Sequence, residues 1–187
     1  MIGDGMGQAQ RLAAERYVQA ATAGEGTAAR GLVMNALPAH GEAQTSSAGA
    51  GVTDSAAAGT AIACGEKTKN GMIGMAADGK RPLKNLVQVA KEFGLKTGVL
   101  SSVSIDHATP ACFYAHQSSR GSYYDIAVQL AAGSVDYFGG GGVNGAHPRY
   151  LKDRATGKER PSPIDLARRN GFAIVNTREE IAAAKPG

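Results

Sequence analysis

PLKNLVQVAKEFGLKTGVLSSVS, residues 82–104, sets a helix pattern directly before a strand pattern. Its first part opens with proline, repeats apolar residues at helical spacing and stops at Gly94, which predicts a helix over residues 82–94. Residues 96–104 form a short run containing β-branched residues and predict a strand. A helix followed at once by a strand is the repeating unit of an α/β fold.

The same alternation continues on both sides of this stretch. Helical spacing with glycine or capping signals marks the helices, and short apolar runs mark the strands. The predicted helices cover residues 7–24, 123–133, 162–171 and 177–185, and the predicted strands cover residues 135–142 and 172–175. Thr177 and Glu180 have the spacing of a capping box. The sequence therefore predicts an α/β fold with a mainly parallel central sheet and helices on both faces.

Length and composition predict one globular α/β domain over residues 1–187. The chain is 43% hydrophobic and 19% charged, which excludes a disordered tail. Its net charge of +4 comes from scattered basic residues, so we expect no specific nucleic-acid binding. No apolar run reaches the ~18 residues that span a bilayer, and no signal-peptide pattern is present, so no membrane segment is predicted.

Three local features fall outside the alternating pattern. Met1 and Ile2 look like the last residues of a strand, so the chain is expected to be cut from a longer protein. Residues 147–163 are polar and bounded by prolines, which predicts a surface excursion with solvated charges. Cys64 and Cys112 lack metal-type spacing and are expected to be small buried hydrophobic residues.

Two glycine-rich segments do not fit nucleotide-binding motifs. Residues 3–7 read G-x-G-x-G and lack the later glycine of the dinucleotide fingerprint. Residues 74–81 match a phosphate loop as far as Arg81, which stands where a serine or threonine would hold magnesium. A turn at Asp78 and Gly79 is the better interpretation of this second segment.

Ser55 lies between an acidic residue and a run of small residues at a predicted helix start. Thr53 and Ala57 replace the glycines of the acyl-hydrolase G-x-S-x-G elbow, and no lysine follows Ser55 three residues later. Taken alone, Ser55 reads as a helix N-cap, and Asp4 reads as a turn aspartate in a glycine loop after a strand. Asp4 is also a hard oxygen donor suited to a divalent metal.

Polar residues after the predicted strand at residues 96–104 form a second group. His107 and Thr109 are expected on one side of an extended stretch, because Pro110 disfavours a helical conformation of the residue before it. A loop histidine bonded to backbone is the plain alternative for His107. Arg120 reads either as a surface cation or as a planar, bidentate donor for a phosphate. Ligand sites in parallel sheets form at the carboxyl ends of strands, which is where this group begins.

Together these motifs resemble the alkaline phosphatase family. The resemblance rests on IGDGMG (residues 2–7), VTDSAAAGTA (52–61), GEKTKNG (65–71), and HATPA followed by AHQSSR (107–120), in that order. It covers most of the chain from Ile2 to Asp125. Each motif alone is a weak signal, but four of them in the right order are highly specific.

The resemblance implies catalytic roles for three residues. Ser55 matches the family's nucleophilic serine, which takes the phosphoryl group and forms a covalent phosphoserine. Arg120 matches the arginine that clamps two phosphate oxygens, and Asp54 resembles the neighbouring residue that helps to orient this arginine. The implied reaction is the hydrolysis of phosphate monoesters.

The resemblance also implies Zn²⁺ at two sites and Mg²⁺ at a third. Asp4 matches the carboxylate that bridges the second zinc and the third metal, and one zinc would activate the hydroxyl of Ser55 while the other stabilises the leaving oxygen and later activates water. His107 and Thr109 match ligands or near ligands of the third metal. Some members have aspartate in place of His107, and an imidazole there would favour zinc or cobalt over magnesium or act through a water.

The family's remaining metal ligands do not occur in this sequence. The family places them downstream of the arginine, as an acid with a histidine four residues later, an Asp-His pair, a final histidine and a glutamate. The only histidine after Arg120 is His147, in a polar segment. We therefore expect residues 1–187 to be an N-terminal fragment of a longer catalytic domain, with an incomplete fold and poor activity by itself unless a partner chain supplies ligands.

Two other functions stay open. One is another metal-dependent member of the superfamily, a phosphodiesterase or sulfatase, although the sulfatase C/S-x-P-x-R signature is absent. The other is a non-catalytic phosphate-binding protein in which Ser55 only caps a helix. Covalent phosphorylation of Ser55 separates these readings. By resemblance, the partners are small-molecule phosphate monoesters and a second copy in a homodimer, and the location is periplasmic or extracellular.

Overall fold

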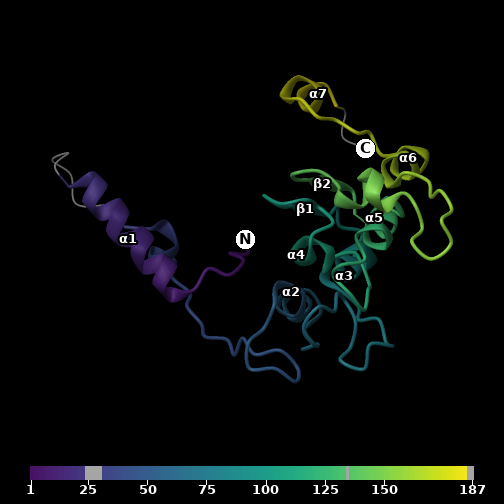
Figure 1. Ribbon diagram of the computed structural model, residues 1–187. Coiled ribbons are helices and arrows are strands. Elements are labelled where there is room, and N and C mark those ends of the chain that lie inside the picture. The colour runs from purple at the N-terminus through teal and green to yellow at the C-terminus, as the bar shows by residue number, and fades with distance from the viewer. Residues whose placement is uncertain (24–30, 134, 185–187) are drawn as a thin grey trace. The chain divides into compact units, whose positions relative to one another are not determined.

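The computed structural model describes residues 1–23, 31–133 and 135–184 (Figure 1). The chain divides into two compact units, Met1–Gln44 and Thr45–Gly187. No helix in the described ranges is long and apolar enough to cross a membrane. The expectation of one domain over residues 1–187 stays a prediction.

The first unit contains helix α1, Gln8–Thr22, and a short 3₁₀ helix, η1, Val33–Ala36. Helix α1 confirms the helix predicted from residue 7, with Gly7 as its N-cap. The predicted end of this helix at Gly24 lies outside the described residues.

The carboxylate of Glu15 links α1 to the segment that enters η1. Its Oε2 atom accepts a hydrogen bond of 2.8 Å from the backbone N–H of Leu32 and one of 2.7 Å from Nδ2 of Asn35. Neither α1 nor η1 has a fully buried residue, so the two hydrogen bonds of Glu15 are a specific link between these elements.

The start of the chain forms a turn, and the prediction that its first two residues end a strand is wrong. Residues 1–3 have no regular structure, and Asp4 and Gly5 form a turn in which Gly5 has a φ of 63°. The N–H of Gly7 donates to the carbonyl of Gly5 at 3.0 Å. A strand needs a neighbour to pair with, and the two strands that the structure describes pair with each other.

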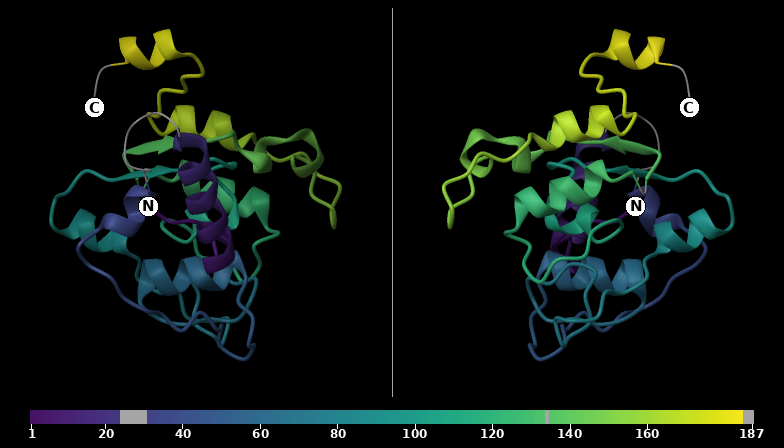
Figure 2. Two further views of the ribbon diagram at one scale, coloured as in Figure 1. Left: turned by 90° about the vertical axis from the view of Figure 1, so that its left-hand side faces the viewer. Right: turned by 90° about the vertical axis from the view of Figure 1, so that its right-hand side faces the viewer.

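The second unit contains the sheet and most of the helices. Its α-helices are α2 (Ser55–Cys64), α3 (Leu86–Glu92), α4 (Ala108–Ala111), α5 (Tyr123–Ala131), α6 (Pro163–Arg169) and α7 (Arg178–Ala183). Its strands are β1 (Gly98–Leu100) and β2 (Tyr137–Gly139), and its 3₁₀ helices are η2 (Asn144–Ala146) and η3 (Pro148–Tyr150). Helices α5 and α6 lie side by side (Figures 1 and 2).

The sheet described here has two parallel strands. Strand β1 pairs with β2 in a register that sets Val99 opposite Phe138. Helices α4 and α5 lie between the two strands in sequence, as a parallel crossover requires. The predicted α/β fold with parallel strands is confirmed, and both strands fall inside the ranges that the sequence predicts.

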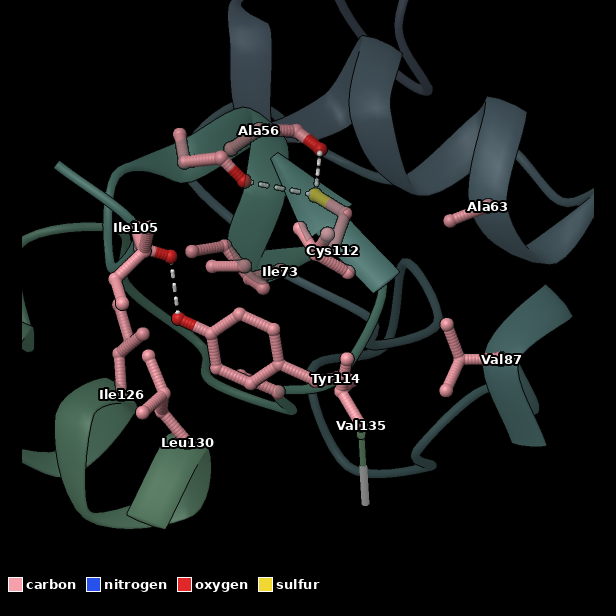
Figure 3. Packing of buried hydrophobic residues seen from close by; sticks show 14 residues of the cluster. Ala56, Ala63, Ile73, Val87, Ile105, Cys112, Tyr114, Ile126, Leu130 and Val135 are labelled. Carbon is pink, nitrogen blue, oxygen red and sulfur yellow. Dashed lines mark hydrogen bonds between the residues drawn. The ribbon is translucent and has the colours of Figure 1, made fainter. Parts of the chain in front are cut away.

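One apolar cluster fills the second unit. It draws on Cys112, Ile126 and Tyr114, which Figure 3 shows beside buried residues of several helices. The ring of Tyr114 meets that of Phe138 edge-on at 5.2 Å. The hydroxyl of Tyr114 donates to the carbonyl of Ile105 at 2.7 Å (Figure 3). Because the buried hydroxyl has an acceptor, the aromatic ring can pack in the core without leaving a polar group unsatisfied.

Helix α3 begins later than its sequence pattern predicts. Asn85 caps it in a capping box, with Gln88 N–H donating to Asn85 Oδ1 at 3.0 Å and Asn85 N–H donating to Gln88 Oε1 at 2.9 Å. Pro82, expected in the first turn, instead forms an isolated bridge with Met75. The capping box gives hydrogen-bond acceptors to two free backbone N–H groups at the start of the helix, whereas a proline in the first turn only removes one such group.

Residues 172–175 do not form the predicted strand. The N–H of Phe172 donates to the carbonyl of Ala167 at 3.0 Å, so this segment begins by closing the end of α6. The Phe172 ring packs against that of Phe138 at a centroid distance of 6.1 Å. This apolar segment therefore packs a ring against Phe138 without pairing as a strand.

Two smaller predictions are confirmed. Asp78 and Gly79 form a turn in which Asp78 Oδ1 accepts from the backbone N–H groups of Lys80 and Arg81. The capping box of α7 is also present. The side chain of Thr177 accepts from the backbone N–H of Glu180, and the side chain of Glu180 accepts from the backbone N–H of Thr177.

Candidate active site

Asp54, and not Ser55, is the N-cap of helix α2. Asp54 has an extended backbone, and its Oδ1 atom accepts a hydrogen bond of 2.9 Å from the N–H of Ala57. Ser55 is the first helical residue, so the interpretation of Ser55 as the cap is wrong. A carboxylate accepts hydrogen bonds from the helix N–H groups and also opposes the positive end of the helix dipole, which explains why the acid takes this position.

The second oxygen of Asp54 holds two further groups. Its Oδ2 atom accepts from the N–H of Gly71 at 3.0 Å and from Nη1 of Arg120 at 3.1 Å. The backbone N–H of Asp54 donates to Oδ1 of Asn70 at 3.1 Å, and Nδ2 of Asn70 donates to the carbonyl of Val52 at 2.9 Å. The loop around Asn70 thus fixes the segment that leads into α2.

Gly71 also fixes the backbone of Arg120. The N–H of Arg120 donates to the carbonyl of Gly71 at 2.6 Å, so Gly71 binds Asp54 through its donor and Arg120 through its acceptor. Gly71 has a φ of 84°, a conformation that residues with a Cβ seldom adopt. This glycine and Asn70 are site residues to which the sequence assigned no role, although both lie in the GEKTKNG motif.

The ion pair between Asp54 and Arg120 is partly open to solvent. The side chain of Arg120 is 32% exposed and that of Asp54 is 25% exposed. A guanidinium carries five N–H donors in a planar fork, and the contact to Asp54 uses the Nη1 nitrogen. The arginine is therefore oriented by one carboxylate while it keeps donors suited to an anion.

Helix α2 brings its positive end to the same place. Ser55 follows the cap directly, and the N-terminal N–H groups of a ten-residue helix favour negative charge nearby. The structure thus brings together three of the predicted residues, Asp54, Ser55 and Arg120, at one helix end. Chemically this arrangement suits an anion that contacts both a hydroxyl and a guanidinium.

His107 and Thr109 do not share one side of an extended stretch, which corrects the sequence prediction. His107 is the N-cap of α4 with an extended backbone, and Thr109 lies inside this short helix. Pro110 is the third helical residue, where its missing N–H costs nothing because no partner in the helix is available at that position. This tolerance outweighs the preference of the residue before proline for an extended conformation.

The imidazole of His107 carries an unsatisfied polar atom. Its Nδ1 is buried and has no hydrogen-bond partner among the described residues. This nitrogen does not make the hydrogen bond to backbone that the plain alternative for His107 predicts. A buried ring nitrogen without a protein partner is compatible with a metal ligand.

Close packing of α2 on α4 positions His107 and Thr109 beside the serine helix. A Cβ added at Gly59 would lie 2.9 Å from Sγ of Cys112 and 3.5 Å from Cα of Thr109, so glycine is needed for this approach. The Cys112 thiol contacts the carbonyl of Ala56 at 3.3 Å (Figure 3). Cys112, which the sequence predicts to be a small buried residue, therefore lies at the contact between α2 and α4.

Burial raises the pKa of both cysteine thiols. Burial raises the pKa of Cys64 to about 11, with the charge of Glu66 adding to the effect. Burial likewise raises the pKa of Cys112 to about 12. Cys112 is fully buried and Cys64 is partly buried, so the sequence prediction for the cysteines is confirmed for Cys112 and holds in part for Cys64.

Asp106 has a structural position that its sequence context does not reveal. Its side chain is fully buried, and its two oxygens accept from the N–H groups of Asn144 at 3.0 Å and Gly145 at 2.7 Å. The carboxylate therefore ties the segment after β1 to the start of η2, just before His107. The sequence pointed to this stretch only because it follows a strand.

The described residues contain no group of three or more histidine, cysteine, aspartate or glutamate side chains that could hold a metal ion. Asp4 lies in the first unit, in the turn with Gly5. His107 and Thr109 lie in the second unit at α4. Their carboxylate, imidazole and hydroxyl groups are of the types that bind Zn²⁺ or Mg²⁺, so each can contribute a ligand, although the described groups do not form a complete site.

Sequence comparisons identify relatives of this chain. The family model described as alkaline phosphatase matches residues 1–139. Streptomycin-6-phosphate phosphatase of Streptomyces griseus is 33% identical over 211 residues, which include 100% of this chain and 44% of that protein. An alkaline phosphatase of Schizosaccharomyces pombe is 32% identical over 96% of this chain and 34% of its own length. The chain thus spans less than half the length of these relatives.

Solved structures agree with the sequence comparisons. The cold-active alkaline phosphatase of Shewanella sp. has a TM-score of 0.78 at 29% identity, over 98% of this chain and 42% of that one. The Thermus thermophilus alkaline phosphatase has a TM-score of 0.72 at 32% identity, over 92% and 36%. A mutant of the alkaline phosphatase from TAB5, solved with Mg bound, has a TM-score of 0.61 at 40% identity, over 72% and 36%.

Proposed function

The chain belongs to the alkaline phosphatase family, and we propose that its protein hydrolyses phosphate monoesters through a phosphoserine formed on Ser55. The observation that carries this proposal is the contact network at the start of α2. Ser55 is the first helical residue, and the preceding Asp54 holds Arg120 at 3.1 Å. A hydroxyl, a guanidinium and a helix N-terminus at one place suit phosphoryl transfer.

The proposed first step is attack by Ser55 on the phosphorus atom of the substrate. A bond forms between Oγ of Ser55 and phosphorus while the bond from phosphorus to the ester oxygen breaks. The ester oxygen leaves with the electron pair and takes up a proton, and the proton of the Ser55 hydroxyl passes to solvent. Arg120 binds oxygens of the transferring group, and Asp54 keeps the guanidinium oriented.

In the proposed second step, water hydrolyses the phosphoserine. A water oxygen attacks the phosphorus of the phosphoserine, the bond to Oγ of Ser55 breaks, and inorganic phosphate leaves. Arg120 keeps its contact with the phosphoryl oxygens in both steps, because the charge there persists. Ser55 regains a proton and is ready for another turnover.

We propose that the protein uses Zn²⁺ and Mg²⁺ in this reaction. When bound, they supply Lewis-acid charge that activates oxygen nucleophiles and offsets phosphoryl charge. The residues of this chain proposed to contribute ligands are Asp4, Ser55, His107 and Thr109. The buried Nδ1 of His107, which has no partner among the described residues, supports its part. The neighbour solved with Mg bound supports a metal requirement.

The proposed substrates are small phosphate monoesters. One relative is named for the removal of phosphate from streptomycin 6-phosphate, and several others are named alkaline phosphatase. These names support monoester hydrolysis over diester or sulfate ester hydrolysis. We further propose a homodimer and a periplasmic or extracellular location for the protein.

The test is hydrolysis of p-nitrophenyl phosphate at alkaline pH, with Zn²⁺ and Mg²⁺ present, by the wild-type protein and by Ser55→Ala. We expect the variant to lose at least about a thousandfold in kcat, since it lacks the nucleophile. Ser102→Ala is the matched control, because Ser102 is an exposed serine of the same unit. Wild-type turnover that Ser55→Ala and Ser102→Ala retain equally would overturn the proposal.

A further inference from the structure

Residues 147–160, called here the basic hairpin, form an excursion from the second unit. Lys152 and Glu159 form an antiparallel bridge across it. The N–H of Asp153 donates to the carbonyl of Lys158 at 2.8 Å, and the N–H of Arg160 donates to the carbonyl of Leu151 at 2.7 Å. Both legs are therefore paired through backbone, so the shape does not depend on the outward side chains.

The side chain of Asp153 builds the tip of the basic hairpin. Its Oδ1 atom accepts from the N–H groups of Ala155 and Thr156 at 3.0 Å and 2.8 Å, and its Oδ2 atom pairs with Arg160. Gly157 completes the turn with a φ of 70°. One acidic residue and one basic residue are thus used inside the basic hairpin itself.

Most of the chain's excess charge lies in this segment. The basic hairpin has five lysine or arginine residues and two acidic ones, so it carries +3 of the chain's net charge of +4. Four of its cations, Arg149, Lys152, Arg154 and Lys158, are exposed and form no ion pair with any described residue. The sequence pattern predicted solvated charges here, but such a concentration of one sign attracts polyanions.

The basic hairpin is anchored beside the segment that carries Arg120. Its Tyr150 ring lies 5.8 Å from the ring of Tyr123, and the guanidinium of Arg160 lies 4.7 Å above the ring of Tyr124. The two tyrosines open α5, three and four residues after Arg120. The Tyr124 hydroxyl also donates to the carbonyl of Pro161, the residue after Arg160, at 3.1 Å. These contacts fix the direction of the hairpin's base.

The side chains present favour a phosphate chain over a membrane or a stacked nucleic acid. Residues 153–158 include no large apolar side chain that could enter a lipid bilayer. The one aromatic residue of the basic hairpin, Tyr150, is already covered by Arg149, whose guanidinium lies 4.6 Å from the ring centroid. Tyr150 also contacts the ring of Tyr123, so the hairpin's aromatic ring already has two partners and is a poor platform for base stacking. What the hairpin offers is a group of exposed cations on a backbone paired by hydrogen bonds.

We propose that the basic hairpin is a binding site for a soluble linear chain of phosphate groups, such as inorganic polyphosphate. Lys152, Arg154 and Lys158 bind successive phosphates, and Arg149 extends the row toward the base. This inference rests on the charge and geometry of the hairpin and not on the catalytic proposal. Binding is therefore measured directly and needs no turnover.

The test measures binding of fluorescently labelled linear polyphosphate to the full chain by anisotropy over a range of salt concentrations. The variant replaces Lys152, Arg154 and Lys158 by glutamine, which keeps the backbone pairing of the hairpin. The control variant replaces Lys80, Arg169 and Arg178 by glutamine; these three residues are also exposed and form no ion pair with any described residue. Both variants lose three positive charges, so only the position of the charges differs.

We expect the hairpin variant to bind at least tenfold more weakly and to reduce the slope of log affinity against log salt by about 2, as the loss of three phosphate contacts requires. The control variant should keep the wild-type affinity within about twofold. Equal weakening in both variants would overturn the proposal, because it would show a response to net charge alone. Tighter binding of an equally charged oligonucleotide or anionic vesicle than of polyphosphate would also overturn it.

Discussion

Nη1 of Arg120 lies 3.1 Å from Oδ2 of Asp54, across 66 residues of sequence. The same carboxylate caps α2 through its other oxygen. One side chain therefore fixes both the helix that begins at Ser55 and the guanidinium beside it. A change at Asp54 must alter the orientation of two of the proposed catalytic residues at once.

Asp54→Asn tests this shared role. Asparagine can still cap α2 through its amide oxygen, so we expect the free energy of unfolding to fall by only about 1 kcal/mol. It replaces the acceptor of Arg120 by an NH₂ group, so kcat/KM for a phosphate monoester should fall about tenfold or more. Steady-state kinetics and urea denaturation measure the two effects. Asp78→Asn, at an exposed turn, serves as the control and should leave kcat/KM unchanged.

Gly59→Ala tests the contact between α2 and α4. The added Cβ would lie 2.9 Å from Sγ of Cys112, so we expect a loss of about 1–3 kcal/mol in the free energy of unfolding. In the double variant with Cys112→Ala, the clashing sulfur is gone, and the two effects should be less than additive. Urea denaturation of the four proteins of this cycle measures the coupling. Strict additivity would mean that the helices do not meet at this pair.

The buried thiols predict slow chemical modification. Burial raises the pKa of Cys64 to about 11 and that of Cys112 to about 12, so few thiolates exist near neutral pH. We expect iodoacetamide to modify Cys64 slowly and Cys112 only after unfolding, since Cys112 is fully buried. Mass spectrometry with and without denaturant follows both sites. Prompt labelling of native Cys112 would contradict the described packing.

The lowered pKa of Asp136 predicts that the contribution of this residue to the stability of the fold depends on pH. Its hydrogen bond from Lys91 and those from Thr97 lower its pKa below the usual range. A group with a depressed folded-state pKa stabilises the fold above its unfolded pKa of about 3.9, and this stabilisation is lost as pH falls through the folded pKa. The difference in unfolding free energy between wild type and Asp136→Asn should therefore shrink below about pH 4.

The measurement is urea denaturation of both proteins at neutral and at strongly acidic pH. Asp165→Asn is a suitable control, because Asp165 forms an exposed pair with Arg168 one helical turn away. A difference between wild type and Asp136→Asn that grows as pH falls would contradict the assigned sign.

Local sequence patterns predicted most of the helices, because helical spacing and capping signals act within one segment. The capping box at Thr177 and the helix that opens at Tyr123 are examples. The pattern failed where distant partners decide the outcome. Residues 172–175 have a strand-like composition but close the end of α6, and Pro82 forms a bridge with Met75 and does not start a helix.

The candidate site divides in the same way. Ser55 and Arg120 could be selected from motifs, since a serine and an arginine in those motifs indicate a nucleophile and a phosphate-binding group. That Asp54 would cap the helix in place of Ser55, and that Gly71 would bind both Asp54 and Arg120, depends on contacts between segments 17 to 66 residues apart. Thr109 shows the opposite failure, because a local rule about proline was overridden by its place in the first turn of α4.

The most direct test of the central claim is to trap the phosphoserine. The protein is incubated with a phosphate monoester in the presence of Zn²⁺ and Mg²⁺, quenched in acid and digested, and its peptides are mapped by mass spectrometry. We predict one phosphorylated peptide, with the phosphate on Ser55, that is absent from Ser55→Ala. Turnover without a phosphorylated Ser55, or phosphate on another residue of the wild-type protein, would contradict the account.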